Sequence, residues 1–222
     1  MQYLYHPEAS VSQLYLSGES HRYLFKVRRH RTGERVYLRN LQNDTLYTYE
    51  ITALDKKEAT LILQSEQELV VKAERKLHIG WCMIDPKSIE KVLPSLNEMG
   101  VEKITFVYCA RSQKQFSPDF DRLQKILLNS SQQCGRSRMM TLEIEESLSA
   151  FVVKYPDAFL LHFSEKRLST MKQIDTVVVG CEGGLTDAEC ALFDTGRVVG
   201  LDTPLILRSE SAATSVASML LL

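Results

Sequence analysis

Three glycines near the C-terminus stand where a chain could bind a ligand through its backbone. They lie in the segment VVVGCEGGLTDAE, which runs from Val177 to Glu189 and places Gly180, Gly183 and Gly184 after a run of valines. Because glycine has no Cβ, its backbone can turn sharply or approach a ligand closely. The pattern fits neither GxxxxGK[ST] nor GxGxxG, so it predicts neither of these nucleotide-binding loops. A tight turn between a strand and a helix is the simpler interpretation of the spacing.

Two charged residues follow in the segment LILRSESAA, where they could take part in acid–base chemistry. Arg208 could stabilise a negative charge that develops on a substrate, and Glu210 could accept a proton. The alternative is structural, because an ion pair at a helix N-terminus would use the same two residue types. Glu182, inside the glycine segment, could hold its loop by accepting backbone N–H bonds.

The residues around these groups predict the elements that position them. Residues 177–179 are a continuous run of valine, which is typical of a buried strand in a parallel sheet. Thr186 and a glutamate three residues later form a capping box, so a helix should begin there. A second strand-like segment covers residues 197–201, and we expect a final helix capped by Ser209 or Ser211.

The composition is that of an ordinary folded protein. The 222 residues are 44% hydrophobic and 25% charged with a net charge of −1, so any attraction to nucleic acid must come from a local patch. The five cysteines form no CxxC pair, which argues against a zinc ribbon or a disulfide framework, and we predict no metal site. Reduced thiols favour a cytoplasmic protein. No secretory signal is visible, and no apolar run approaches the ~20 residues that span a bilayer, so no membrane association is expected.

Residues 1–70 predict a small β-rich module. Short runs of β-branched and aromatic residues recur about every ten residues, which favours a barrel or sandwich. Only the stretch from Ser20 to Val27 has helical spacing. The module contains one dense basic run, from His21 to Arg39, with seven Lys or Arg residues against one acid. On charge alone, this run suits a solvated face as well as a phosphate-contacting surface.

Residues 66–76 are polar and charged and form the expected linker. From Leu77 onward, strand-like and helical patterns alternate, which predicts a parallel sheet covered on both faces. The expected strands are 77–84, 104–108, 157–163 and 176–179, and the expected helices are 86–100 and 120–133.

The C-terminal segments resemble a known family. GCEGGLTDAE followed by LILRSESAA is similar to the GPEGG(F/L)(S/T)xxE … ILRxETA signature of the RsmE family, knotted (SPOUT-type) methyltransferases that modify N3 of a uridine in small-subunit (16S) ribosomal RNA. Weaker matches are HRYLFKVRRHRTGE at residues 21–34, NEMGVEKI at 97–104 and NSSQQCGR at 129–136. The chain departs from the signature at Cys181, where proline is typical, and at Asp202, where glycine is typical.

The resemblance implies an α/β fold with a PUA-like RNA-binding β-barrel over residues 1–70 and a SPOUT methyltransferase domain over residues 71–222. It also implies a deep trefoil knot, which composition would never predict because knots are rare. The cofactor would be S-adenosylmethionine, enclosed by three loops at strand ends. The residues expected to bind it are Leu161, His162, Gly180, Glu182, Gly183, Gly184, Leu201, Leu205, Ile206, Leu207 and Ser211.

The resemblance assigns further residues to RNA and to catalysis. The partner is expected to be small-subunit ribosomal RNA or the 30S subunit. The expected RNA contacts are His21, Arg22, Lys26, Arg28, Arg29, Arg31 and Arg111. The expected catalytic residues are Arg136, Arg208 and Glu210. Without the resemblance, Arg136 is a surface arginine at the end of a helix.

The resemblance also implies an obligate homodimer with shared sites, in which Arg136 reaches the partner subunit. The face of the last helix that carries Val216, Met219 and Leu220 is expected to meet its counterpart there. Two other functions stay open, namely a non-catalytic RNA-binding or ribosome-assembly protein and a ribose 2′-O-methyltransferase of the same superfamily.

Overall fold

The computed structural model describes residues 2–113, 115–171 and 173–222. The chain forms two compact units. One contains Met1–Lys72 with Leu128–Met139, and the other contains Ala73–Leu127 with Met140–Leu222. In the described part of the chain, no helix has the length and apolar character that a membrane crossing requires.

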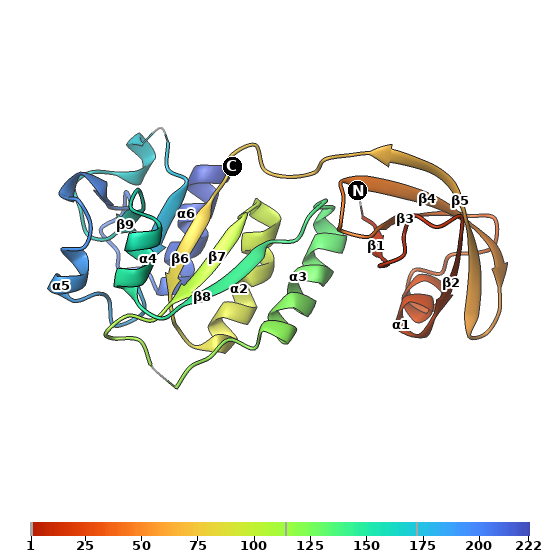
Figure 1. The fold of residues 1–222 in the computed structure, drawn as a ribbon, viewed down its shortest axis with the longest axis horizontal. Coiled ribbons are helices and arrows are strands. Elements are labelled where there is room, and N and C mark those ends of the chain that lie inside the picture. The colour runs from red at the N-terminus through yellow and green to blue at the C-terminus, as the bar shows by residue number, and fades with distance from the viewer. Residues whose placement is uncertain (1, 114, 172) are drawn as a thin grey trace. The chain divides into compact units, whose positions relative to one another are not determined.

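The N-terminal unit is built on a five-stranded sheet with the order β1-β3-β4-β5-β2. Strands β1 and β3 pair in parallel, and the other neighbours are antiparallel (Figure 1). The strands are β1 (Leu4–Tyr5), β2 (Gln13–Ser17), β3 (Arg35–Arg39), β4 (Thr45–Leu54) and β5 (Glu58–Glu68). The predicted β-rich character of this module is confirmed, but β5 extends into residues 66–68, which were expected to belong to the linker.

Buried side chains on one face of this sheet form the core of the N-terminal unit. Leu16, Leu38, Ile51 and Leu61 are at most 1% exposed. The predicted helical stretch is present as α1 (Gly18–His21), followed by a π-helix, η1 (Arg22–Val27). Leu24 of this π-helix joins the core and Phe25 packs against it, so apolar side chains anchor this part of the basic run.

Residues 128–139 pack onto the N-terminal sheet although they follow it by about sixty residues in sequence. The Tyr3 hydroxyl donates to the Arg136 carbonyl (2.9 Å), and the Ser137 N–H donates to the Val71 carbonyl (3.0 Å). Asp44, in the loop after β3, accepts from Arg138 Nη2 (2.7 Å) and Ser137 Oγ (2.7 Å). These bonds hold the segment that follows α3.

The C-terminal unit contains a six-stranded, wholly parallel sheet with the order β11-β9-β10-β6-β7-β8. Its strands are β6 (His78–Cys82), β7 (Lys103–Val107), β8 (Thr141–Glu145), β9 (Phe159–Leu161), β10 (Thr176–Val179) and β11 (Val198–Val199). Strand β10 lies in the interior of the sheet, and Val177, Val178 and Val179 are at most 1% exposed. The predicted parallel sheet is therefore confirmed.

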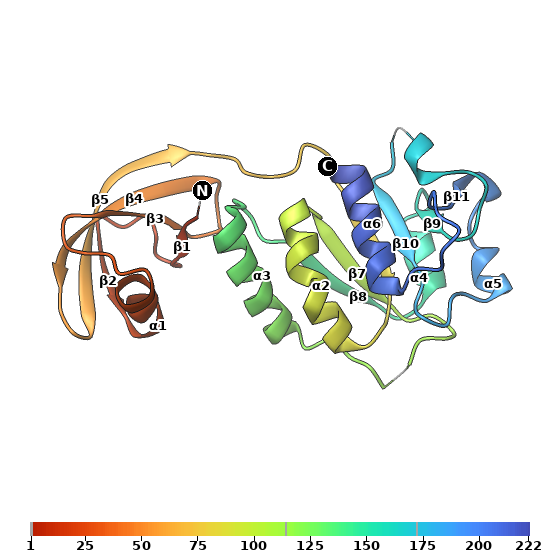
Figure 2. The same cartoon turned by 180° about the vertical axis from the view of Figure 1, so that it is seen from behind.

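Helices cover both faces of this sheet. Helices α2 (Pro86–Met99) and α6 (Ser209–Leu221) pack together on one face, and α4 (Leu148–Lys154) covers the other (Figures 1 and 2). Gly80 of β6 explains the close approach of α4, because a Cβ there would lie 2.5 Å from the Phe151 ring. The remaining helices are α3 (Phe120–Cys134), η2 (Leu168–Thr170), α5 (Asp187–Cys190) and η3 (Thr195–Arg197).

Local signals set several of the element ends. Asp85 caps α2 by accepting from the Ser88 N–H (3.2 Å), and Gly100 ends this helix in the left-handed region with φ of 101°. Strand β8 and helix α4 were not predicted, although the alternation of polar and apolar residues in β8 is typical of a strand, because the two elements have only five and seven residues. The predicted cap of α6 was wrong, because Ser209 lies inside the helix and Arg208 occupies the N-cap without a side-chain bond.

Candidate functional site

A cavity of about 720 Å³ lies at the carboxyl ends of three neighbouring strands, β9, β10 and β11. Each strand is followed by a loop that forms one wall of the cavity, as is usual for ligand sites in parallel α/β sheets. Its size falls in the range of small-molecule sites. The walls are formed by Leu161–Ser164 after β9, Val179–Leu185 after β10, and Gly200, Leu201, Thr203 and Leu205–Ser209 after β11, with Arg111, Arg167 and Ala212 beside them.

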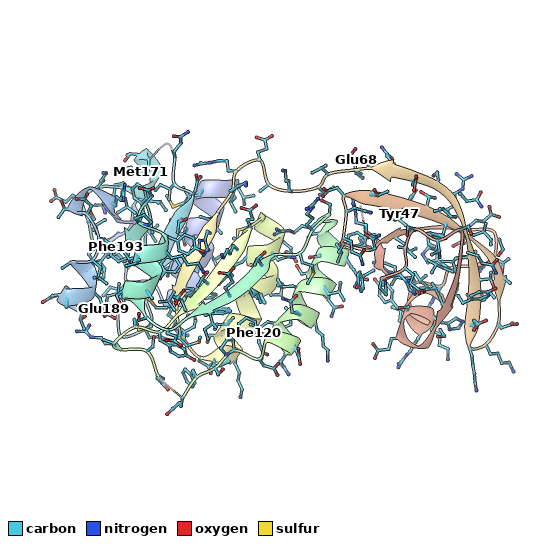
Figure 3. All side chains as sticks on the ribbon, in the orientation of Figure 1. Tyr47, Glu68, Phe120, Met171, Glu189 and Phe193 are labelled. Atoms are coloured by element: carbon cyan, nitrogen blue, oxygen red, sulfur yellow. The ribbon has the colours of Figure 1, made fainter. Side chains whose placement is uncertain are left out.

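The loop after β10 is a turn that glycine makes feasible. The Gly184 N–H donates to the Cys181 carbonyl (2.9 Å), and Gly184 has φ of 68°, a region that side chains with a Cβ rarely adopt. The next helix begins with the predicted capping box, because the Glu189 N–H donates to Thr186 Oγ1 (3.3 Å) and the Thr186 N–H donates to Glu189 Oε2 (2.9 Å). Glu189 is labelled at α5 in Figure 3.

Ser209 connects this loop to α6 and to the central strand. Its hydroxyl donates to the Gly180 carbonyl (2.5 Å) and accepts from the Trp81 indole N–H (2.9 Å). Both Ser209 and Trp81 are buried. Ser209 was expected to cap the helix, and nothing in its local pattern indicated a bond to a residue 29 positions earlier.

Arg167 holds the other two walls together. Its Nη1 donates to the carbonyls of Ser164 (3.0 Å) and Leu201 (3.0 Å), which belong to the loops after β9 and β11. Leu205 and Ile206, at the rim of the cavity, are 71% and 81% exposed. This apolar rim is open to solvent in a single chain.

The cavity brings together ten of the eleven residues predicted to bind the cofactor, although their loops are widely separated in the sequence. Ser211 is the exception, because it lies on the exposed side of α6. Of the predicted catalytic residues, Arg208 lines the cavity and Glu210 lies in the first turn of α6. Among the described residues, the Glu182 carboxylate makes no hydrogen bond to the loop backbone, so the expectation that it holds the loop was wrong.

Arg111 was predicted to contact RNA, but it lies on the cavity wall. Its Nη1 donates to the carbonyls of Gly183 (2.8 Å) and Leu185 (3.3 Å). The preceding residue is bonded as well, because the Ala110 N–H donates to Glu189 Oε1 (2.7 Å). These bonds attach the short segment after β7 to the loop after β10, the glycine loop.

Three buried thiols lie beside the same loop. Cys109 Sγ lies 3.5 Å from Cys181 Sγ and 3.0 Å from Ser112 Oγ. Hydrogen bonds from the Cys181 and Cys82 thiols lower the pKa of Cys109, and the same bonds, with burial, raise the pKa of Cys82 and Cys181. All five cysteines are free, and the described residues contain no His, Cys, Asp or Glu cluster suited to a metal.

Arg136 belongs to the N-terminal unit, where it follows the end of α3. It is 9% exposed and its Nε donates to the Arg138 carbonyl (3.3 Å), so the alternative interpretation as a surface arginine was wrong. Nearby, Gln132 accepts from the Tyr5 N–H of β1 (2.7 Å), and Ser137 bonds Val71 and Asp44 of the same unit.

The N-terminal basic run is mostly exposed. Arg28 Nε donates to the Tyr23 hydroxyl (2.9 Å), and its guanidinium lies 5.4 Å from the centre of that ring. The two ends of the run, His21 and Arg39, are buried, and His21 Nε2 pairs with the Asp55 carbonyl (3.0 Å). The exposed members of the predicted RNA-binding set here are Arg22, Lys26, Arg28, Arg29 and Arg31.

The fold and the cavity belong to a recognised class. Residues 71–221 match the RNA methyltransferase domain, and residues 16–64 match the RNA methyltransferase PUA domain. Within this class, the chain is 37% identical to the ribosomal RNA small subunit methyltransferase E proteins of two Helicobacter pylori strains, over 99% of each chain. The chain belongs to the RsmE family of ribosomal RNA small subunit methyltransferases.

Solved structures agree on the fold over both units. One is the ribosomal RNA small subunit methyltransferase E of Neisseria gonorrhoeae, bound to S-adenosylmethionine. Its TM-score is 0.80 at 20% identity, and the match covers 98% of this chain and 95% of that one. A Legionella pneumophila protein in complex with the same cofactor also has a TM-score of 0.80, at 24% identity, with 98% and 96% of the two chains covered.

Proposed function

We propose that this protein transfers a methyl group from S-adenosylmethionine to N3 of a uridine in small-subunit (16S) ribosomal RNA. The observation that carries the proposal is the cavity after β9, β10 and β11, because both signature segments of the RsmE family form its walls. Membership of that family, through relatives 37% identical over 99% of the chain, supplies the substrate class.

The residues of the cavity suit S-adenosylmethionine. Leu161, Leu185 and Leu207 offer apolar walls for an adenine ring, and the exposed backbone of the loops offers donors and acceptors for its edge. The glycines allow the loop backbone to approach the ligand without a Cβ between them. We therefore keep the predicted set of cofactor contacts as our proposal, with Ser211 its weakest member.

When bound, the cofactor supplies an electrophilic methyl group on a positively charged sulfur. The role of this chain is to hold both reactants in line and to promote loss of the weakly acidic proton on uracil N3. Arg208, on the cavity wall, is suited to stabilise the uracil anion through its oxygens. Glu210, in the first turn of α6, is our candidate base.

We propose that residues 1–70 form a domain that binds RNA and that residues 71–222 form a domain that transfers the methyl group. The exposed cations from Arg22 to Arg31 suit phosphate contacts, whereas the buried His21 supports the fold beneath them. The knot threaded by the last helix stays a prediction from the family. A cytoplasmic location fits the five free cysteines and a ribosomal substrate.

We also propose that the functional unit is a homodimer, with Arg136 approaching the partner's site. Of the face predicted from the sequence, Val216 and Leu220 are at most 4% exposed, which leaves Met219, 41% exposed, as the part that a second copy can contact. The apolar rim at Leu205 and Ile206 is the better candidate for coverage by a second copy.

The decisive experiment is nucleoside mass spectrometry of 16S RNA from a strain that lacks this gene, before and after incubation with purified protein and S-adenosylmethionine. Naked RNA and 30S subunits are compared as substrates. Appearance of N3-methyluridine supports the proposal, and 2′-O-methyluridine would indicate the ribose activity instead.

A non-catalytic role makes a different prediction. Calorimetry with S-adenosylmethionine should then detect no binding near micromolar concentrations while RNA binding persists. Tight cofactor binding together with transfer to rRNA excludes that function.

A further inference from the structure

We propose that Arg111 is a positioning residue for the cofactor, acting through the glycine loop rather than as an RNA contact. This inference rests on the proposed assignment of the cavity to S-adenosylmethionine. The family resemblance predicted that Arg111 contacts RNA, yet its guanidinium donates to two carbonyls of the loop that lines the cavity.

The glycine loop has little of its own to hold it in one conformation. Gly180, Gly183 and Gly184 lack side chains, and glycine loses more backbone entropy on ordering than any other residue. Within the loop, the Gly184 N–H donates to the Cys181 carbonyl (2.9 Å) and the Cys181 thiol donates to the Gly184 carbonyl (3.5 Å). A loop of this kind needs support from outside if it is to present one surface to a ligand.

Three consecutive residues after β7 give that support. The Cys109 thiol contacts the Cys181 thiol at the start of the loop, and the Ala110 N–H donates to the Glu189 carboxylate beyond its end. Arg111 donates to the Gly183 carbonyl in the middle of the loop. Two of these contacts are charge-assisted, because Arg111 is a cationic donor to two carbonyls and Ala110 donates to a carboxylate. Arg111 also packs over the loop, since a Cβ on Gly183 would lie 3.1 Å from the Arg111 Cβ.

A single guanidinium nitrogen of Arg111 makes the contacts that hold the loop. Both described hydrogen bonds use Nη1 and end on backbone carbonyls of the loop, Gly183 and Leu185. Carbonyls bound by Arg111 are fixed in orientation, and because each peptide unit is planar, the N–H groups on the other side of those peptides are fixed as well. The loop is thereby preorganised before the cofactor binds.

The test is cofactor affinity in Arg111→Ala, measured by calorimetry with S-adenosylhomocysteine, with Arg122→Ala as the control. Arg122 belongs to the same unit and is exposed and paired with Glu90 away from the cavity, so its loss removes an equal charge. We expect Arg111→Ala to weaken binding by about tenfold, the effect of losing one charge-assisted hydrogen bond. Affinity for 16S RNA should stay unchanged in both variants.

Chemical rescue separates positioning from a general loss of structure. Guanidinium ion at millimolar concentration can enter the space left by the side chain and should restore part of the affinity in Arg111→Ala, but should leave Arg122→Ala unaffected. Arg111→Lys should retain more affinity than alanine, because its ammonium can still donate to a loop carbonyl. If Arg111→Ala does not fold, Arg111→Lys and Arg111→Gln provide the same comparison.

The opposite outcomes are clear. Unchanged cofactor affinity with weakened RNA binding would overturn the inference and restore Arg111 to the RNA surface. Failure of the wild-type protein to bind S-adenosylhomocysteine would instead refute the proposed function itself, so the two failures are distinguishable.

Discussion

The Ser209 hydroxyl lies 2.5 Å from the Gly180 carbonyl, which joins the first turn of α6 to the first residue of the glycine loop. The same hydroxyl accepts from the buried Trp81 indole (2.9 Å). One small side chain therefore connects the central strand, the cavity loop and the C-terminal helix. In this family member, the cavity is built onto the core rather than appended to it.

Loss of this hydroxyl should destabilise the protein. Ser209→Ala leaves the Trp81 N–H buried without an acceptor, and we expect a cost of about 1–3 kcal/mol, seen as a lower thermal midpoint. Ser218→Ala, on the exposed side of the same helix, should have little effect. In a double-mutant cycle, Trp81→Phe combined with Ser209→Ala should cost less than the sum of the two single changes. Additive costs would mean that the bond contributes little.

A branched side chain in the glycine loop should abolish cofactor binding without unfolding the chain. Gly183→Val places a Cβ 3.1 Å from the Arg111 Cβ and adds bulk where the backbone lines the cavity. Calorimetry with S-adenosylmethionine measures the loss, and circular dichroism checks the fold. Wild-type affinity in this variant would contradict the assignment of the loop to the cofactor.

The exposed cations of the N-terminal unit should govern RNA affinity. Replacing Arg28 and Arg29 with alanine is expected to weaken binding to 16S RNA and to reduce its salt slope by roughly one unit for each lost phosphate contact. Cofactor affinity should be unaffected. An unaltered salt slope would identify the basic run as a solvated surface, as charge alone had left open.

Shared sites predict complementation between two inactive chains. Arg136→Ala and Glu210→Ala are each expected to be inactive, and mixed dimers refolded together should regain activity where one complete site is assembled. The measurement is methyl transfer by the refolded mixture against each variant treated alone. If mixed dimers form and stay inactive, each site is built within one chain and Arg136 does not act across the interface.

Folding stability should depend on His78 at mildly acidic pH. The ring is buried against Phe151 and Tyr155, its Nε2 pairs with Thr105 Oγ1 (2.8 Å), and burial lowers its pKa from 6.5 to about 4. Between those values the unfolded chain binds a proton that the folded chain does not. The folded state therefore gains stability as pH rises from about 4 to 6.5, by about 3 kcal/mol at 1.36 kcal/mol per pKa unit.

Urea unfolding from pH 4.5 to 7.5 measures this dependence. Charged groups that influence the ring are Lys103, Lys154 and Glu143. His78→Leu removes the titrating group, so its stability should change much less across the same range, whatever its absolute value. Parallel profiles for the two proteins would show that another group carries the effect.

Much of the local structure was determined by the sequence itself. The valine run of β10, the Thr186 capping box and the glycine end of α2 all form as predicted, because each depends on residues within one turn or one strand. Family signatures added the three cavity loops, since matching segments carry their structural context with them. Strand β8 and helix α4 were not predicted, because each contains too few residues to show a clear pattern.

Tertiary structure alone decided how distant residues meet. Arg111 reaches Gly183, Ser209 reaches Gly180, and Arg136 is held by Tyr3, across separations of 72, 29 and 133 residues. Such contacts follow from the order and register of strands in the two sheets, where a one-residue slip turns each side chain to the other face. The residue types of a short segment do not determine that register. For this reason the bonds that Arg111 and Ser209 donate to the loop after β10 were not predicted from the sequence.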